Sequence, residues 1–64
     1  MQVKHIIEEI EFRNRVISIH ERNNLTVYDG EYDIRTIEPN ILNKEVNTYI
    51  TKIEDGVMYL DIYI

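Results

Sequence analysis

The sequence predicts an α+β domain in which an N-terminal helix packs on a small antiparallel sheet, a β-meander plus a C-terminal hairpin, with one short helix before the hairpin. Three observations support this fold class. An isoleucine stripe at helical spacing lies near the N-terminus, β-branched residues alternate with polar ones after it, and two Asp-Gly pairs interrupt runs rich in Ile, Val, Thr and Tyr. At 64 residues, the chain forms a single domain, residues 1–64.

The first element is an amphipathic helix. Val3, Ile6, Ile7 and Ile10 follow the i, i+3, i+4, i+7 spacing of one helical stripe, and charged residues occupy the positions around it. We therefore expect a helix over residues 2–12. Packing of the stripe on the sheet is a better interpretation than an amphipathic helix that binds a partner.

The second element is a strand. Between residues 15 and 21, Ile17 and Ile19 alternate with polar side chains, a pattern typical of a strand with one buried face. The alternative is a single helix continuing to about residue 22, since Ile17 lies seven residues after Ile10 and the stretch contains no Gly or Pro.

Turn residues then divide the chain into a meander. Asn23-Asn24 tolerates positive φ and predicts a tight turn into a second strand at residues 25–28. Asp29-Gly30 allows a further turn, which would make residues 15–36 a short meander. Alternatively, the middle strand ends at Gly30.

A short helix precedes the last part of the chain. Pro39 is the only proline, and proline suits the first turn of a helix because its missing N–H would have no partner there. We expect one or two helical turns at residues 38–44.

The last twenty residues, 45–64, predict a β-hairpin. Asp55-Gly56 favours a two-residue type I′ turn, which sets Glu54 opposite Val57 and Ile53 opposite Met58. Because side chains alternate at period two, this register gives the hairpin one strongly apolar face. That face carries Tyr49, Thr51, Ile53, Met58, Leu60, Ile62 and Ile64.

A chain of this size needs support beyond its own core, since such a core rarely yields more than about 3 to 5 kcal/mol of net stability. It has no cysteine, which excludes disulfides, so oligomerisation is the available supplement. Five tyrosines against one phenylalanine and no tryptophan are typical of an interface. We expect a homodimer through the C-terminal hairpin, with an interface of Tyr59, Tyr63, Leu60 and Ile62. Partial cover of the tyrosine face by the first helix is an equal alternative.

Composition excludes several classes of function. The net charge of −5 disfavours direct binding to nucleic acid, which depends on Lys and Arg neutralising phosphates. No apolar run approaches the length of a membrane-spanning helix, and the N-terminus mixes acids with apolar residues, unlike a signal peptide. We expect a cytoplasmic protein that does not bind membranes.

The residues that carry chemistry form no catalytic pattern. Ser18, the only serine, has no nucleophile elbow around it, and His5 and His20 lack a third ligand at metal-binding spacing. Both glycines follow aspartates in predicted turns, so a phosphate cradle is not expected. We expect no enzymatic activity, no cofactor and no metal site.

An acidic strip is the candidate binding surface. In an extended chain Asp29, Glu31 and Asp33 point the same way, about 6.5 to 7 Å apart at each step. Such a strip could imitate nucleic-acid phosphates and occupy the basic groove of a nuclease or regulator. The alternative is a solvated strand face that keeps an edge strand from aggregating. We take these three residues as the candidate contacts to a protein partner.

The order of three segments, VYDG at 27–30, ILNKEV at 41–46 and DGVMYLDI at 55–62, resembles small uncharacterised proteins of phages and prophages of Gram-positive bacteria. The chain departs from that pattern at Thr36-Ile37-Glu38, where Asp-Ile-Pro usually opens the small helix, and its proline comes one residue later. The resemblance spans most of the chain. It implies a mobile-element origin, and with it a location in the cytoplasm of a bacterial host, but it transfers no residue role.

Inhibitors of host defence systems, among them anti-CRISPR proteins, belong to that class of small acidic phage proteins. The resemblance therefore implies a non-enzymatic interaction protein that inhibits a host defence protein by direct binding. The alternative is a structural or regulatory subunit that acts through homo-oligomerisation and has a partner encoded beside it.

Overall fold

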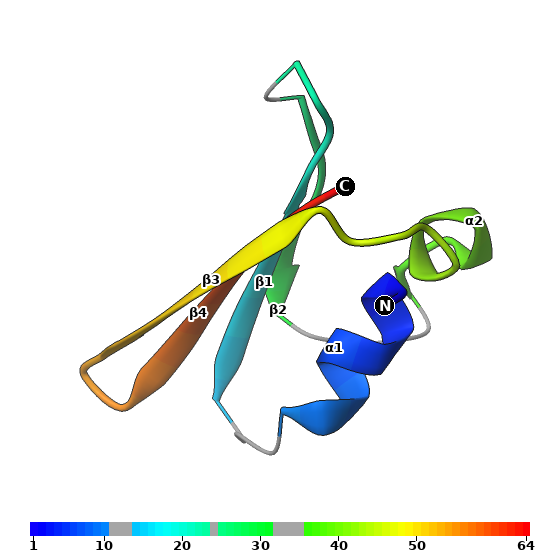
Figure 1. Ribbon diagram of the computed structural model, residues 1–64. Helices are drawn as coiled ribbons and strands as arrows, with labels where there is room; N and C mark the ends of the chain where they lie inside the picture. Colours follow the sequence, from blue (N-terminus) through cyan, green and yellow to red (C-terminus); the bar gives the residue numbers. More distant parts are fainter. Residues whose placement is uncertain (11–13, 24, 32–35) are drawn as a thin grey trace.

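The computed structural model describes residues 1–10, 14–23, 25–31 and 36–64. Within these ranges it contains α1 (Val3–Glu9), β1 (Arg15–His20), β2 (Thr26–Glu31), α2 (Pro39–Leu42), β3 (Thr48–Glu54) and β4 (Val57–Tyr63). Figure 1 shows both helices beside one sheet, with α1 ahead of every strand in the chain. The predicted α+β class is confirmed.

The four strands form one sheet in the order β2-β1-β4-β3. The outer pairs, β1–β2 and β3–β4, are antiparallel, but the central pair β1–β4 is parallel. The expectation of a wholly antiparallel sheet is therefore wrong at its centre. A parallel pair needs a long crossover, and here the crossover contains β2, α2 and β3.

The C-terminal hairpin forms as predicted. Asp55 has φ 52° and Gly56 has φ 75°, the two positive values that a type I′ turn requires. The predicted register is confirmed along the hairpin, from the Glu54–Val57 pair to the Thr48–Tyr63 pair. The Asp-Gly turn therefore fixes which side chains of β3 and β4 share a face.

The N-terminal half keeps the predicted order of elements. α1 ends at Glu9, because Ile10 has an extended backbone with φ −92° and ψ 108°, so the helix is shorter than expected. β1 is a strand, and a single helix running to residue 22 does not form. β1 turns into β2, and the Glu21 N–H donates to the carbonyl of Leu25 at 2.8 Å.

The expected second turn at Asp29-Gly30 is wrong. Gly30 lies inside β2, where it pairs with Ile17, and its φ of 152° is tolerated by a residue without a side chain. β2 stays paired with β1 as far as Glu31, and this pairing supplies hydrogen-bond partners for its backbone. A turn at Asp29-Gly30 would break this pairing. A third meander strand would fall on residues 32–35, which lie outside the described residues.

The apolar stripe of α1 packs on the central strands. The buried core consists of Val3, Ile6, Ile7, Ile17, Ile19, Ile37, Met58, Leu60 and Ile62. α2 forms within the predicted residues 38–44 but spans only Pro39–Leu42, and Ile41 and Leu42 pack against the margin of this core. The packing of α1 on β1 and β4 fixes one face of the sheet as the core face.

The N-terminal segment is also held by the chain that follows α2. The Val3 N–H donates to the Lys44 carbonyl at 3.0 Å, and the Val46 N–H donates to the Met1 carbonyl at 2.8 Å.

Neither helix of the described segments has the length and apolar character needed to cross a bilayer.

Candidate binding face of the sheet

The face of the sheet opposite the core is lined by side chains that no described helix buries, and we call it the open face. By strand register and alternation it carries Val16, Ser18, His20, Thr26, Asp29, Thr48, Ile50, Lys52, Glu54, Val57, Tyr59, Asp61 and Tyr63. None of these residues is buried, and Tyr59 is 40% exposed.

One row of side chains crosses all four strands of this face. The strand pairings align Asp29 of β2 with Ser18 of β1, Ser18 with Asp61 of β4, and Asp61 with Ile50 of β3. The Ser18 hydroxyl donates to Oδ1 of Asp29 at 2.9 Å. Two carboxylates from strands far apart in the sequence therefore flank a single serine.

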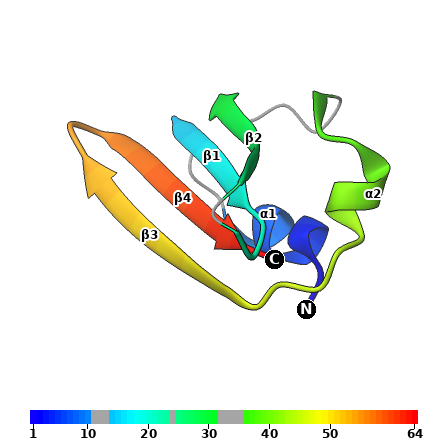
Figure 2. The same ribbon diagram turned by 90° about the horizontal axis from the view of Figure 1, so that it is seen from above.

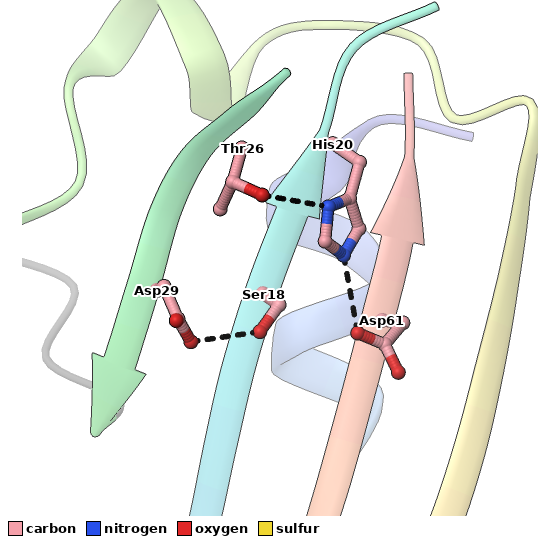
Figure 3. Close-up of polar contacts among 5 residues, drawn as sticks. All are labelled: Ser18, His20, Thr26, Asp29 and Asp61. Atoms are coloured by element: carbon pink, nitrogen blue, oxygen red, sulfur yellow. Dashed lines mark hydrogen bonds and ion pairs between the residues drawn. The ribbon is translucent and has the colours of Figure 1, made fainter. Parts of the chain in front are cut away.

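His20 joins three strands on the open face (Figure 3). Its Nδ1 lies 3.1 Å from Oγ1 of Thr26, and its Nε2 lies 3.1 Å from Oδ1 of Asp61. The imidazole also stacks on the ring of Tyr63, with ring centroids 4.9 Å apart and planes 25° from parallel. Both ring nitrogens therefore have partners, and the histidine links β1 to β2 and to β4.

Serine, histidine and aspartate lie together here, but their contacts differ from those of a hydrolytic triad. In a triad the imidazole accepts the proton of the nucleophile while the carboxylate orients the imidazole. Ser18 instead bonds to Asp29, and His20 bonds to Thr26 and Asp61. The described residues also contain no group of three acidic, histidine or cysteine side chains that could hold a metal ion. The geometry is that of polar crosslinks between strands.

The acidic strip predicted from the sequence is described only in part. Asp29 is exposed on the open face, and Glu31 ends β2, where its backbone pairs with Val16. Asp33 lies outside the described residues. The structure adds Asp61, whose side chain is 41% exposed. Period-two alternation could place Asp61 beside the tyrosines of its own strand, but only the parallel β1–β4 pairing brings it to Ser18 and His20.

The four residues predicted at a dimer interface divide between two faces. Tyr59 and Tyr63 lie on the open face, as their alternation requires. Leu60 is 1% exposed and Ile62 is fully buried, because α1 covers the face of β4 on which they lie. The expectation that Leu60 and Ile62 form a contact surface is wrong for the folded chain, since they already belong to its core.

β3 is the most exposed strand of the sheet. All seven of its residues are exposed, including the apolar side chains Tyr49 at 47%, Ile50 at 56% and Ile53 at 64%. It pairs with β4 on one side and forms an edge of the sheet on the other. Figure 2 shows that β3 runs away from both helices toward its turn.

A groove lies between β2 and α2, with a volume of about 460 Å³. Glu21, Glu38 and Lys44 give its lining both signs of charge, and the hydroxyl of Tyr28 forms a hydrogen bond of 2.9 Å with that of Thr36 beside it. No buried polar side-chain atom in the described part of the chain lacks a hydrogen-bond partner, so no buried unpaired group points to a ligand in this groove.

The open face therefore combines partly or fully exposed carboxylates, hydrogen-bonded polar side chains, the exposed Tyr59 and the half-buried Tyr63. Tyrosine is enriched in protein interfaces, and a surface of this kind is suited to contact with another macromolecule. Comparison of the chain with protein-family models, curated proteins and solved structures found no match.

Proposed function

We propose that the protein is a non-enzymatic interaction protein of phage or mobile-element type, which inhibits a host defence protein by binding it directly through the open face. The observation that carries the proposal is the row across the sheet, in which Asp29 and Asp61 flank Ser18 on a face that no described helix covers. A protein with a basic surface, such as a nuclease groove, is the complementary partner.

The charge of this face supports a basic partner. Among the described residues, Asp29 and Asp61 bond to Ser18 and His20, and neither forms an ion pair with lysine or arginine. Lys52 lies on the same face, but its ammonium is 3.0 Å from the carboxylate of Glu54. The net charge of the chain is −5, so its field attracts basic surfaces and repels nucleic acid.

The tyrosines supply contact area beside the carboxylates. Tyr59 is exposed, and Tyr63 is held in a fixed orientation by its stacking on His20. An aromatic ring that is already ordered loses little conformational entropy on binding. The polar crosslinks of His20 therefore serve to present a preorganised surface.

Charge reversal on the open face tests this proposal. The double variant Asp29→Lys with Glu31→Lys should lose at least tenfold in affinity for the inhibited defence protein and should lose inhibition. The matched control, Glu8→Lys with Glu9→Lys, makes the same change in net charge at two exposed positions of α1. Both variants are compared with the wild type in a phage-interference assay and in capture from bacterial lysate. Full inhibition by the open-face variant would reject the open face as the binding surface.

The second candidate function is that of a structural or regulatory subunit. Such a subunit acts through homo-oligomerisation and has a partner encoded beside it. It is favoured by the apolar side chains of β3, since Tyr49, Ile50 and Ile53 are largely exposed in a single chain. Light scattering on the purified chain tests this second function: a chain that stays monomeric would reject it, whereas a dimer is compatible with both functions.

A further inference from the structure

We propose that two copies of the chain pair through their β3 edges, antiparallel and about a two-fold axis at Thr51, so that two four-stranded sheets become one continuous sheet of eight strands. The inference goes beyond the proposed inhibition, since it rests on β3 and not on the carboxylates of the open face.

β3 has the properties of an unfinished edge. It has a strand partner on one side only within the described chain, and all seven of its residues are exposed. An edge strand of this length presents a row of free backbone N–H and C=O groups, which is a template for another strand. Figure 2 shows that the end of β3 toward the turn extends away from both helices.

The hairpin decides which backbone groups of β3 point outward. Glu54 and Val57 flank the two-residue turn, so they form a pair that exchanges both backbone hydrogen bonds. In an antiparallel ladder such pairs alternate with pairs whose N–H and C=O groups point away from the partner strand. In β3 the residues with outward groups are therefore Tyr49, Thr51 and Ile53.

These three residues are symmetric about Thr51. A second copy placed antiparallel about this residue sets Thr51 opposite its own counterpart and Tyr49 opposite Ile53 of the second copy. Each of the three facing pairs exchanges two hydrogen bonds, so the junction contains about six. The whole of β3, from Thr48 to Glu54, takes part in this register.

Neighbouring registers give β3 less favourable backbone hydrogen bonds or cross-strand side-chain pairs. A register centred between two residues would set outward groups against inward ones. Centring on Lys52 would place two ammonium groups directly opposite each other, which is destabilising. Centring on Ile50 would require the N–H of Asn47, which already donates to the Tyr63 carbonyl at 2.8 Å. The register about Thr51 avoids all three problems.

The side chains also fit this register. On the core-facing side, Tyr49 lies beside Ile53 of the second copy and the two Thr51 side chains meet, which are favourable cross-strand pairs. On the open-face side, Ile50 lies opposite Lys52 of the second copy. The apolar stem of a lysine can cover an isoleucine while its ammonium stays on its own Glu54, at 3.0 Å. The exposed apolar residues of β3 thereby gain cross-strand neighbours.

Cysteine crosslinking tests the register directly, because the chain has no cysteine of its own. Thr51→Cys places two thiols opposite each other at the two-fold axis, about 5.5 Å apart between Cα atoms, within the range that a disulfide spans. Ile53→Cys is the matched control, since its two copies lie about four residues apart along the strands. Air oxidation should give a disulfide dimer with Thr51→Cys and at least tenfold less with Ile53→Cys. Equal yields, or no dimer with Thr51→Cys, would overturn the inference.

A second experiment removes a single outward donor. Thr51→Pro deletes an N–H that β4 does not use, so it should leave circular dichroism unchanged while the dimer, measured by light scattering, weakens at least tenfold toward the 7.7 kDa monomer. Thr51→Ala is the control that keeps the N–H and should stay dimeric. A wild-type chain that remains at 7.7 kDa at millimolar concentration would refute the pairing. Both variants keep Asp29 and Glu31, so inhibition can persist when pairing fails. In the same way, pairing can persist when charge reversal abolishes inhibition.

Discussion

Ile53 and Met58 face each other across the β3–β4 hairpin, yet Ile53 is 64% exposed whereas Met58 is 6% exposed. The two side chains share a face and a register, so the difference comes from what lies above them. The core that α1 forms over β1 and β4 includes no residue of β3. Within one hairpin, β4 therefore contributes to the core and β3 remains exposed to solvent.

Truncation of the two strands should have unequal effects. Leu60→Ala leaves a cavity in the core and should lower the free energy of unfolding by about 2 to 5 kcal/mol, comparable to the whole stability of a domain of this size. Ile53→Ala should change it by about 0.5 kcal/mol or less in the monomer. Urea denaturation at low protein concentration measures both, and similar losses would contradict the division between the strands.

The turn at Asp55-Gly56 should be sensitive to side chains at its second position. Gly56 has φ 75°, a conformation that L-residues adopt with strain, so Gly56→Ala should lower the free energy of unfolding by roughly 1 kcal/mol. Asp55→Asn is the control, because asparagine also tolerates the φ of 52° at that position. Thermal unfolding distinguishes them. Equal melting temperatures for the wild type and Gly56→Ala would show that the turn relaxes without cost.

The His20–Asp61 contact should couple β1 and β4. A double-mutant cycle with His20→Asn and Asp61→Asn should give a coupling free energy of about 0.5 to 1 kcal/mol, since the Asp61 side chain is 41% exposed and partly screened by solvent. The control is the Lys52–Glu54 pair, whose side chains are 69% and 57% exposed and whose coupling should be smaller. Equal coupling free energies in the two pairs would show that the His20–Asp61 contact stabilises the fold no more than the exposed Lys52–Glu54 pair does.

Glu45 should titrate differently when the N-terminal charge is removed. Its carboxylate accepts a hydrogen bond of 2.9 Å from the Met1 ammonium; that bond first, and the ammonium charge second, lower the pKa of Glu45 below its usual 4.5. Because the folded pKa is lowered, this contribution to stability is present above the unfolded pKa and is lost as pH falls through the folded pKa.

N-terminal acetylation tests this assignment. In an NMR titration of the Glu45 carboxyl, acetylation should raise its pKa toward 4.5. Glu45→Gln identifies the resonance by removing it. Identical titration curves for the free and the acetylated chain would show that the ammonium does not perturb Glu45.

The parts of the fold that the sequence predicted are those with local causes. The Asp55-Gly56 turn sets the register of its own hairpin, and Pro39 marks the start of α2 because both signals act within a few residues. The isoleucine stripe of α1 predicted burial for the same reason. The Asp29-Gly30 pair is also a turn-forming pair, but the turn predicted there does not form, because pairing with β1 holds Gly30 inside β2.

The open face could not be assembled from local patterns. Asp61 meets His20 across 41 positions of sequence, through a parallel pairing that no turn residue specifies. Leu60 and Ile62 show the complementary error. Their alternation correctly gave an apolar face, but the sequence did not indicate that α1 covers this face on β4 and leaves it exposed on β3.

The position of β4 has a consequence for synthesis. The last strand, β4, is inserted between β1 and β3, so a nascent chain that lacks it offers the isoleucines of α1 only Ile17 and Ile19 of β1. The earlier segments cannot complete the core until β4 has left the ribosome. Folding is then a single late event, and C-terminal truncations within β4 should be cleared by proteases as unfolded polypeptide.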